Sequence, residues 1–143
     1  MAAAFTQDLA LFVQLGDGDM LMLTEDGEIE VVFEHDDELY GSLTHSLCQP
    51  NSAAYASVTC RKIDRPRLFL LSTDGLRDSL QGEMSQFERV CRWVNQRLTN
   101  EGWEQVKSDM PHWLHQLSER GNGDDATLGI VAWNMENEHD QIV

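Results

Sequence analysis

The chain has 143 residues, the size of one ordinary domain, and 41% of them are hydrophobic, a composition that can build a folded core. It carries 25 acidic against 10 basic side chains, a formal net charge of −15. That charge disfavours binding to nucleic acid and to anionic membranes, and it favours divalent cations or basic partners.

The cysteines indicate a reducing compartment. Cys48, Cys60 and Cys91 are odd in number and widely spaced, so they build neither a disulfide framework nor a CxxC zinc site. No apolar run is long enough to cross a membrane, and the opening MAAAFTQD lacks the basic start of a signal peptide. We therefore expect a cytoplasmic protein.

Three apolar runs near the start of the chain predict strands. They cover residues 8–15, 20–24 and 29–33, and the separating turns are Gly16-Asp17-Gly18 and Glu25-Asp26-Gly27. An Asp-Gly turn supplies the positive φ that a tight hairpin needs. We interpret the three runs as a meander of adjacent strands.

A polar segment without periodicity follows, at residues 35–54. It is long enough to predict a functional flap rather than a simple connection. Strand character resumes at residues 55–62 and 67–72, and the second of these is a continuous apolar run suited to burial on both faces.

Two helical patterns and a final strand complete the chain. Apolar residues recur at helical spacing from Phe87 to Leu98 and from Trp103 to Leu117. Pro111 lies inside the second pattern and predicts either a kink or a fresh helix that starts near Asp109. A strand from Thr127 to Trp133 precedes an acidic tail.

Aspartates stand where apolar strands meet glycine-rich turns. In LFLLSTDGLRD the strand ends at Asp74, and Gly75 lets the backbone turn sharply while leaving that carboxylate open to a ligand. In RGNGDDATLGIV, Asp124 and Asp125 are adjacent and repel each other unless a cation or a donor compensates them. Asp17 ends a third strand. Each motif alone also fits an ordinary turn.

The order of these motifs resembles the protein phosphatase 2C family of metal-dependent phosphatases, in particular its bacterial branch. A strand ending in GDG, a flap, STDGLRD, a helical insertion and GNGDDATLGIV follow one another over about residues 3–133. The resemblance implies that Asp74 and Asp124 are metal ligands and that Asp17 helps to hold an additional, weaker ion. Asp125 stands where many members carry asparagine, and Thr127 where they carry serine or threonine.

The neighbours of these ligands have predicted supporting roles. Gly75 and Asp125 belong to the matched motifs, and Asp78 lies one helical turn after Asp74, where it either supports a metal-bound water or solvates the helix. His45 in the flap is a candidate substrate-side group. His112 and His115 share a helix at metal-ligand spacing, but no third ligand is placed beside them, which favours surface histidines.

The resemblance also implies a reaction. Two Mg²⁺ or Mn²⁺ ions, with a third in some members, orient a phosphoserine or phosphothreonine, and a metal-bound water attacks the phosphorus in line. The residues agree with this chemistry, since all-oxygen donors favour Mg²⁺ or Mn²⁺ over zinc. The CxxxxxR spacing occurs at Cys91–Arg97, but it lies inside the predicted helix and not in a phosphate-binding loop, so it supplies no competing nucleophile.

One part of the family pattern has no counterpart. Family members begin with strands that carry a basic phosphate-binding residue and a V-x-D-G-x-G motif whose aspartate bridges both metals, and no such segment precedes Asp17. We therefore expect residues 1–135 to be the C-terminal portion of such a domain and 136–143 an acidic tail. Apolar strands without their usual cover predict association with a complementary N-terminal fragment.

Together these observations predict an α+β fold, an antiparallel β-sandwich flanked by helices. The predicted function is metal-dependent phosphoprotein phosphatase, a hydrolase in bacterial signalling that is weak or inactive as this chain alone. A first alternative is a non-catalytic module that engages a kinase or a phosphoprotein. A second is a cation-binding structural domain with no phosphate role.

Overall fold

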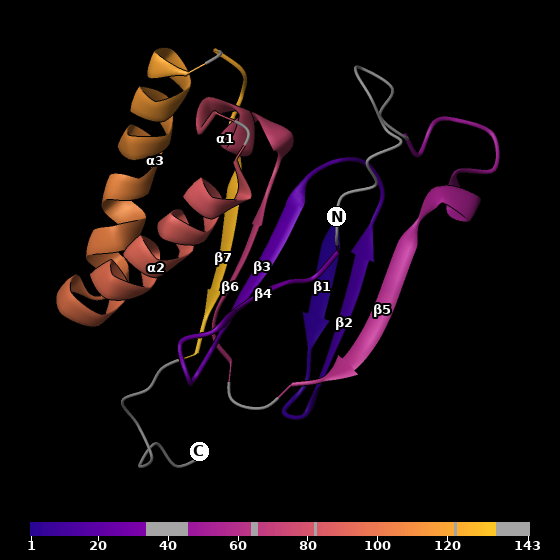
Figure 1. The fold of residues 1–143 in the computed structure, drawn as a ribbon, viewed down its shortest axis with the longest axis horizontal. Coiled ribbons are helices and arrows are strands. Elements are labelled where there is room, and N and C mark those ends of the chain that lie inside the picture. The colour runs from indigo at the N-terminus through magenta and orange to yellow at the C-terminus, as the bar shows by residue number, and fades with distance from the viewer. Residues whose placement is uncertain (34–45, 64–65, 82, 122, 134–143) are drawn as a thin grey trace.

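A computed structural model of the chain describes residues 1–33, 46–63, 66–81, 83–121 and 123–133. These residues form seven strands in two antiparallel sheets, and the α-helices cover one side of the resulting sandwich (Figure 1). The α+β class and the antiparallel sandwich predicted from the sequence are confirmed.

The two sheets divide the strands unequally. The first has three strands in the order β1-β2-β5, and the second has four in the order β4-β3-β6-β7. Their bounds are β1 Ala2–Phe5, β2 Leu9–Gln14, β3 Asp19–Thr24, β4 Ile29–Val31, β5 Ser57–Lys62, β6 Pro66–Ser72 and β7 Leu128–Ala132. A short 3₁₀ helix, Ser52–Tyr55, precedes β5.

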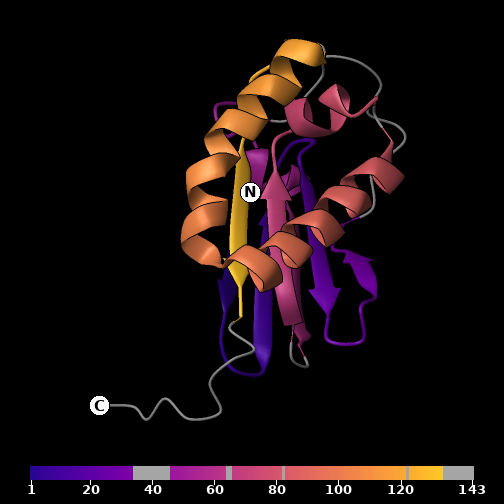
Figure 2. The ribbon, with the colours of Figure 1, turned by 90° about the vertical axis from the view of Figure 1, so that its left-hand side faces the viewer.

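Three α-helices lie between β6 and β7 along the chain. They are α1 (Asp74–Ser79), α2 (Met84–Glu101) and α3 (Trp103–Arg120). The last two are joined at Gly102, whose φ of 81° is open to glycine at little cost. All three lie against the outer face of the four-stranded sheet, as Figure 2 makes clear from the helix side.

The two central strands of the larger sheet are buried on both faces. Leu21, Leu68 and Leu70 pack toward the helices, whereas Met20 and Phe69 pack toward the three-stranded sheet. This arrangement confirms the expectation that residues 67–72 are covered on both sides, and it explains why the run is continuously apolar.

The outer face of the three-stranded sheet carries no helix in the described part of the chain. Alternation along β2 turns Ala10 and Phe12 into the core, so its other side chains face outward. Leu9, Leu11 and Val58 are 43%, 42% and 62% exposed. An apolar sheet face is therefore open to solvent opposite the helical side.

The predicted meander is wrong in part. Runs 8–15 and 20–24 are not adjacent strands, because β2 and β3 belong to different sheets. The amide of Gln14 donates to the carbonyls of Gly16 (3.1 Å) and Gly18 (2.7 Å), which shapes the turn that passes from one sheet to the other. Runs 20–24 and 29–33 do pair as a hairpin, with Gly27 at φ 83°.

Of the two outcomes expected at Pro111, a kink or a fresh helix that starts near Asp109, the fresh helix does not form. Helix α3 continues through Pro111, which is exposed, and the helix break falls at Gly102 instead. Met110 is buried beside the proline, so packing of the apolar stripe keeps the helix in one piece. Strand β1 was not predicted, because three alanines carry no clear strand signal.

Candidate functional site

The first motif folds as a strand that leads directly into a helix. Strand β6 ends at Ser72, and after Thr73 the helix α1 begins with Asp74. The backbone N–H of Gly75 donates to Oδ1 of Asp74 at 2.8 Å, which orients the half-buried carboxylate at the helix start. The predicted strand-end position of Asp74 is thus what the chain adopts.

The second motif is a loop that α3 holds in place. The hydroxyl of Ser118 donates to the carbonyl of Asp124 at 2.7 Å, and the N–H of Gly123 donates to the carbonyl of Ser118 at 3.1 Å. Asp124 and Asp125 are both exposed at the end of this loop, just before β7. The adjacent carboxylates therefore stay in contact with solvent, which reduces their mutual repulsion.

Backbone contacts join the two motifs. The N–H of Thr73 donates to the carbonyl of Thr127 at 3.2 Å, and the N–H of Thr127 donates to Oγ1 of Thr73 at 3.0 Å. Gly75 touches the same loop, because a Cβ there would lie 2.6 Å from the carbonyl oxygen of Asp125 and 3.3 Å from Cβ of Asp124. The start of α1 and the aspartate loop thus form one unit, although some fifty residues separate them along the chain.

A buried ion pair lies beside this unit. Oδ1 of Asp19, the first residue of β3, is 3.0 Å from Nη1 of Arg77 on α1, and the two side chains are 1% and 17% exposed. Burial raises the pKa of Asp19 to about 6, and Arg77 opposes this effect by its positive charge. Asp78, Asp17 and Asp74 raise that pKa further by repulsion.

These relations place the predicted ligands. Asp74 and Asp124 come together at Gly75. Asp17 is half-buried and lies two residues before Asp19, the first residue of β3. Asp78 is exposed on α1. The backbone N–H and carbonyl of Thr127 both bond Thr73. The prediction for His45 lies outside the described residues.

The donors fit divalent ions in kind but not in number. Carboxylates are the ligands that Mg²⁺ and Mn²⁺ prefer. Within the described ranges, however, no three histidine, cysteine, aspartate or glutamate side chains are grouped closely enough to hold a metal ion. The two helical histidines have other neighbours, since His112 bonds Gln116 at 2.8 Å and His115 lies 3.3 Å from Glu119.

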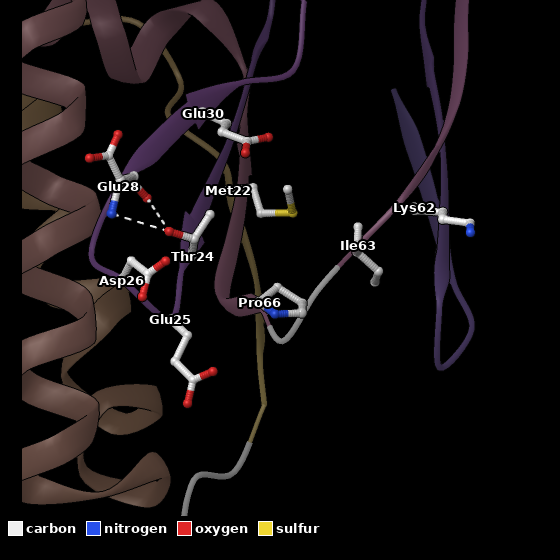
Figure 3. Close-up of a pocket in the computed structure, with 9 residues that line it drawn as sticks. All are labelled: Met22, Thr24, Glu25, Asp26, Glu28, Glu30, Lys62, Ile63 and Pro66. Carbon is white, nitrogen blue, oxygen red and sulfur yellow. Dashed lines mark hydrogen bonds between the residues drawn. The ribbon is translucent and has the colours of Figure 1, made fainter.

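A separate acidic cavity of about 530 Å³ lies at the other end of β3 (Figure 3). It is bounded by the β3–β4 hairpin and by the segment after β5, and none of the predicted metal ligands lines it. Its lining residues are Met22, Thr24, Glu25, Asp26, Glu28, Glu30, Lys62, Ile63 and Pro66. The cavity is therefore distinct from the unit that carries Asp74 and Asp124.

Four residues of this region were missed from the sequence. Thr73 and Ser118 hold backbone groups, a role that leaves no motif. Asp19 and Arg77 had a signal: a charge that opens an apolar strand is buried at a cost unless it is paired. The arginine three residues after Asp74 was the available partner in the adjacent motif.

Comparisons with known proteins agree with this arrangement. A sequence model of the protein phosphatase 2C family matches residues 1–117. The crystal structure of a bacterial serine phosphatase mutant superposes with a TM-score of 0.55 at 16% sequence identity, over 91% of this chain and 50% of that one. The chain thus spans about half the length of that relative.

No curated protein matches the chain. Among the described residues, no helix is both long and apolar enough to cross a membrane. The family model covers well over half of the chain, and the fold is that of a phosphatase of this kind. The chain therefore belongs to the protein phosphatase 2C family.

Proposed function

We propose that the chain is part of a Mg²⁺- or Mn²⁺-dependent phosphatase that acts on phosphoserine or phosphothreonine in proteins. The observation that carries the proposal is the union of the Asp74 and Asp124 motifs. These motifs lie far apart in sequence and meet through Gly75 and Thr73 in a chain of this family. When bound, the divalent ions supply positive charge for the phosphate and activate water.

The residues of this chain position the candidate carboxylates. Asp74 and Asp124 present carboxylates from one joined unit, and Asp17 lies just before β3, the strand that pairs with β6. Gly75 allows the loop to approach, while Thr73 fixes the loop to β6. Since the described residues group no three donors, we expect the remaining ligands to come from the half of the domain that this chain does not match.

Catalysis by this chain alone should accordingly be weak. A missing ligand lowers the affinity for the ions, and a missing phosphate-binding cation lowers the stabilisation of the transition state. A non-catalytic module that binds a phosphoprotein or a kinase is the second candidate, and the lack of a three-donor group in the described ranges favours it. The cytoplasmic location proposed from the cysteines fits both.

We further propose that the complementary half of the domain covers the open sheet face, whether it is linked to this chain or separate. The three-stranded sheet exposes Leu9, Leu11 and Val58, whereas helices cover the opposite side of the sandwich (Figure 2). The solved relative has about twice the length that this chain matches, which leaves enough chain for such a cover. Burial of a patch of this kind is a typical driving force for association.

Calorimetric titration with Mn²⁺ tests the metal site. Wild type should bind the ion, Asp74→Asn should not, and Asp8→Asn is the matched control because it removes an exposed carboxylate from the β1–β2 turn. Equal binding by all three proteins would contradict the proposal.

A second titration, with a phosphopeptide in the presence of Mn²⁺, separates the functions. Metal binding alone favours a cation-binding structural domain, and binding of neither ligand favours a relic. Binding of both supports the phosphatase or the module, and these differ in Asp74-dependent hydrolysis of p-nitrophenyl phosphate. Fast turnover by the isolated chain would contradict the expected weak activity.

A further inference from the structure

The ion pair between Asp19 and Arg77 connects β3, which begins two residues after Asp17, with α1, which begins at Asp74. We propose that Arg77 is a positioning residue, a built-in counter-charge that fixes α1 against β3 and keeps these carboxylates together before a divalent ion binds. This inference rests on the metal site of the proposed function.

The position of Arg77 suits this role. It lies three residues after Asp74 and one before Asp78, and residues three apart on a helix are neighbours on its surface. From the other side it reaches Oδ1 of Asp19 at 3.0 Å across the boundary between helix and sheet. The guanidinium therefore contacts the carboxylate of Asp19 on β3 and has Asp74 as a neighbour on its own helix.

The charges around Asp19 describe the same assembly. Arg77 attracts the negative charge of Asp19, while Asp78, Asp17 and Asp74 repel it. Burial strengthens each of these interactions, because the side chain of Asp19 is almost entirely removed from water. Without the guanidinium, the carboxylates of β3 and α1 would repel one another across the junction.

A purely structural ion pair makes a different prediction. In that case Arg77 would compensate the charge of Asp19 alone. Removal of both partners would then leave no unpaired buried charge, which is often tolerated for buried pairs. In our proposal Arg77 also compensates Asp17, Asp74 and Asp78. Loss of Arg77 should then lower the melting temperature even after the charge on Asp19 has been removed.

Thermal melting of two variants in EDTA separates these cases. Asp19→Asn removes the buried charge and keeps Arg77, whereas Asp19→Asn/Arg77→Met removes both and retains most of the aliphatic stem. We expect the double variant to melt several degrees below the single one. We also expect Mn²⁺ to raise its melting temperature more than that of Asp19→Asn, because the added ion replaces the missing cation.

Two further variants complete the test. Arg97→Met breaks an ion pair with Glu101 and Asp109 away from the site, and its response to Mn²⁺ should equal that of wild type. Addition of Asp78→Asn to the double variant should restore part of the lost melting temperature by removing a repelling charge.

The outcomes of the inference and of the proposed function are distinguishable. If Mn²⁺ stabilises none of the proteins, the metal function fails, yet recovery through Asp78→Asn still supports Arg77 as a counter-charge. Equal melting of the single and double variants would overturn the inference. A deficit in the double variant that neither Mn²⁺ nor Asp78→Asn relieves would overturn it too, because that pattern indicates lost packing.

Discussion

Thr73 and Thr127 hold each other by two hydrogen bonds, one from each backbone N–H, at 3.2 and 3.0 Å. Only one of the two hydroxyls takes part: Oγ1 of Thr73 accepts from Thr127 and donates to the carbonyl of Asp125 at 3.4 Å. The side chain of Thr127 is exposed and has no such bond among the described residues.

Two matched substitutions therefore differ in effect. Thr73→Val keeps the shape of the side chain and leaves the N–H of Thr127 without its acceptor, so we expect the free energy of unfolding to fall by about 1 kcal/mol. Thr127→Val should change it by less than about 0.5 kcal/mol. Urea denaturation measures both. Equal losses would show that the link between Thr73 and Thr127 does not depend on the hydroxyl of Thr73.

Gly75→Ala should disturb both halves of the site. Its Cβ would lie 2.6 Å from the carbonyl oxygen of Asp125, and backbone atoms cannot rotate away as a side chain can. We expect a loss of about 1–3 kcal/mol in the free energy of unfolding, typical of overpacking. Because the loop that carries Asp124 must shift, the affinity for Mn²⁺ should fall as well.

Gly27→Asn is the control for this substitution. Gly27 has open space around its Cβ position, and asparagine adopts a positive φ more readily than other residues, so the strain at φ 83° should cost only about 1 kcal/mol and leave the Mn²⁺ affinity unchanged. A Gly75→Ala protein that melts and binds Mn²⁺ like Gly27→Asn would show that the close approach to Asp125 is not needed.

Much of this fold was predictable because local patterns agreed with the tertiary structure. The continuous apolar run at 67–72 predicted a strand buried on both faces, and the two amphipathic stripes predicted α2 and α3. Asp74 and Asp124 could be selected as candidate ligands because each stands near a strand boundary next to glycine, where a side chain is open to a ligand.

The parts that failed depend on contacts that a sequence does not display. Whether two strands share a sheet depends on the path of the turn between them, and here the side chain of Gln14 bonds that turn at Gly16 and Gly18. The pairing of Asp19 with Arg77 joins residues 58 positions apart, and neither has a periodic signature. Such long-range polar contacts emerge only when the elements are packed together.

The open face of the three-stranded sheet leads to a prediction about association. Leu11→Thr places a β-branched residue, which suits a strand, on an exposed face, so it should leave the free energy of unfolding within about 0.5 kcal/mol of wild type. It should also lower the binding of an apolar dye and any self-association seen by size-exclusion chromatography. Unchanged dye binding would argue that this face is not the accessible apolar patch.

The neighbouring Phe12 provides the contrast. Its side chain is fully buried between the sheets and meets Phe5 at 5.8 Å and Phe69 at 5.4 Å between ring centroids. Phe12→Leu should therefore destabilise the fold by about 1 kcal/mol or more while leaving the dye signal of the native protein unchanged. The pair of variants separates the covered face of β2 from the open one.

The three thiols should differ sharply in reactivity. Cys48 and Cys60 are exposed, whereas Cys91 is fully buried in α2, and burial raises the pKa of its thiol from 9.0 to about 12. A raised thiol pKa means less thiolate, so at pH 8 Cys91 reacts more slowly than an ordinary thiol, apart from its lack of access. With a chromogenic disulfide reagent we expect two thiols to react quickly and the third only as the helix layer opens. A Cys91→Ala variant should lose the slow phase alone, and three fast thiols in the wild type would mean that α2 does not stay packed on β3 and β6.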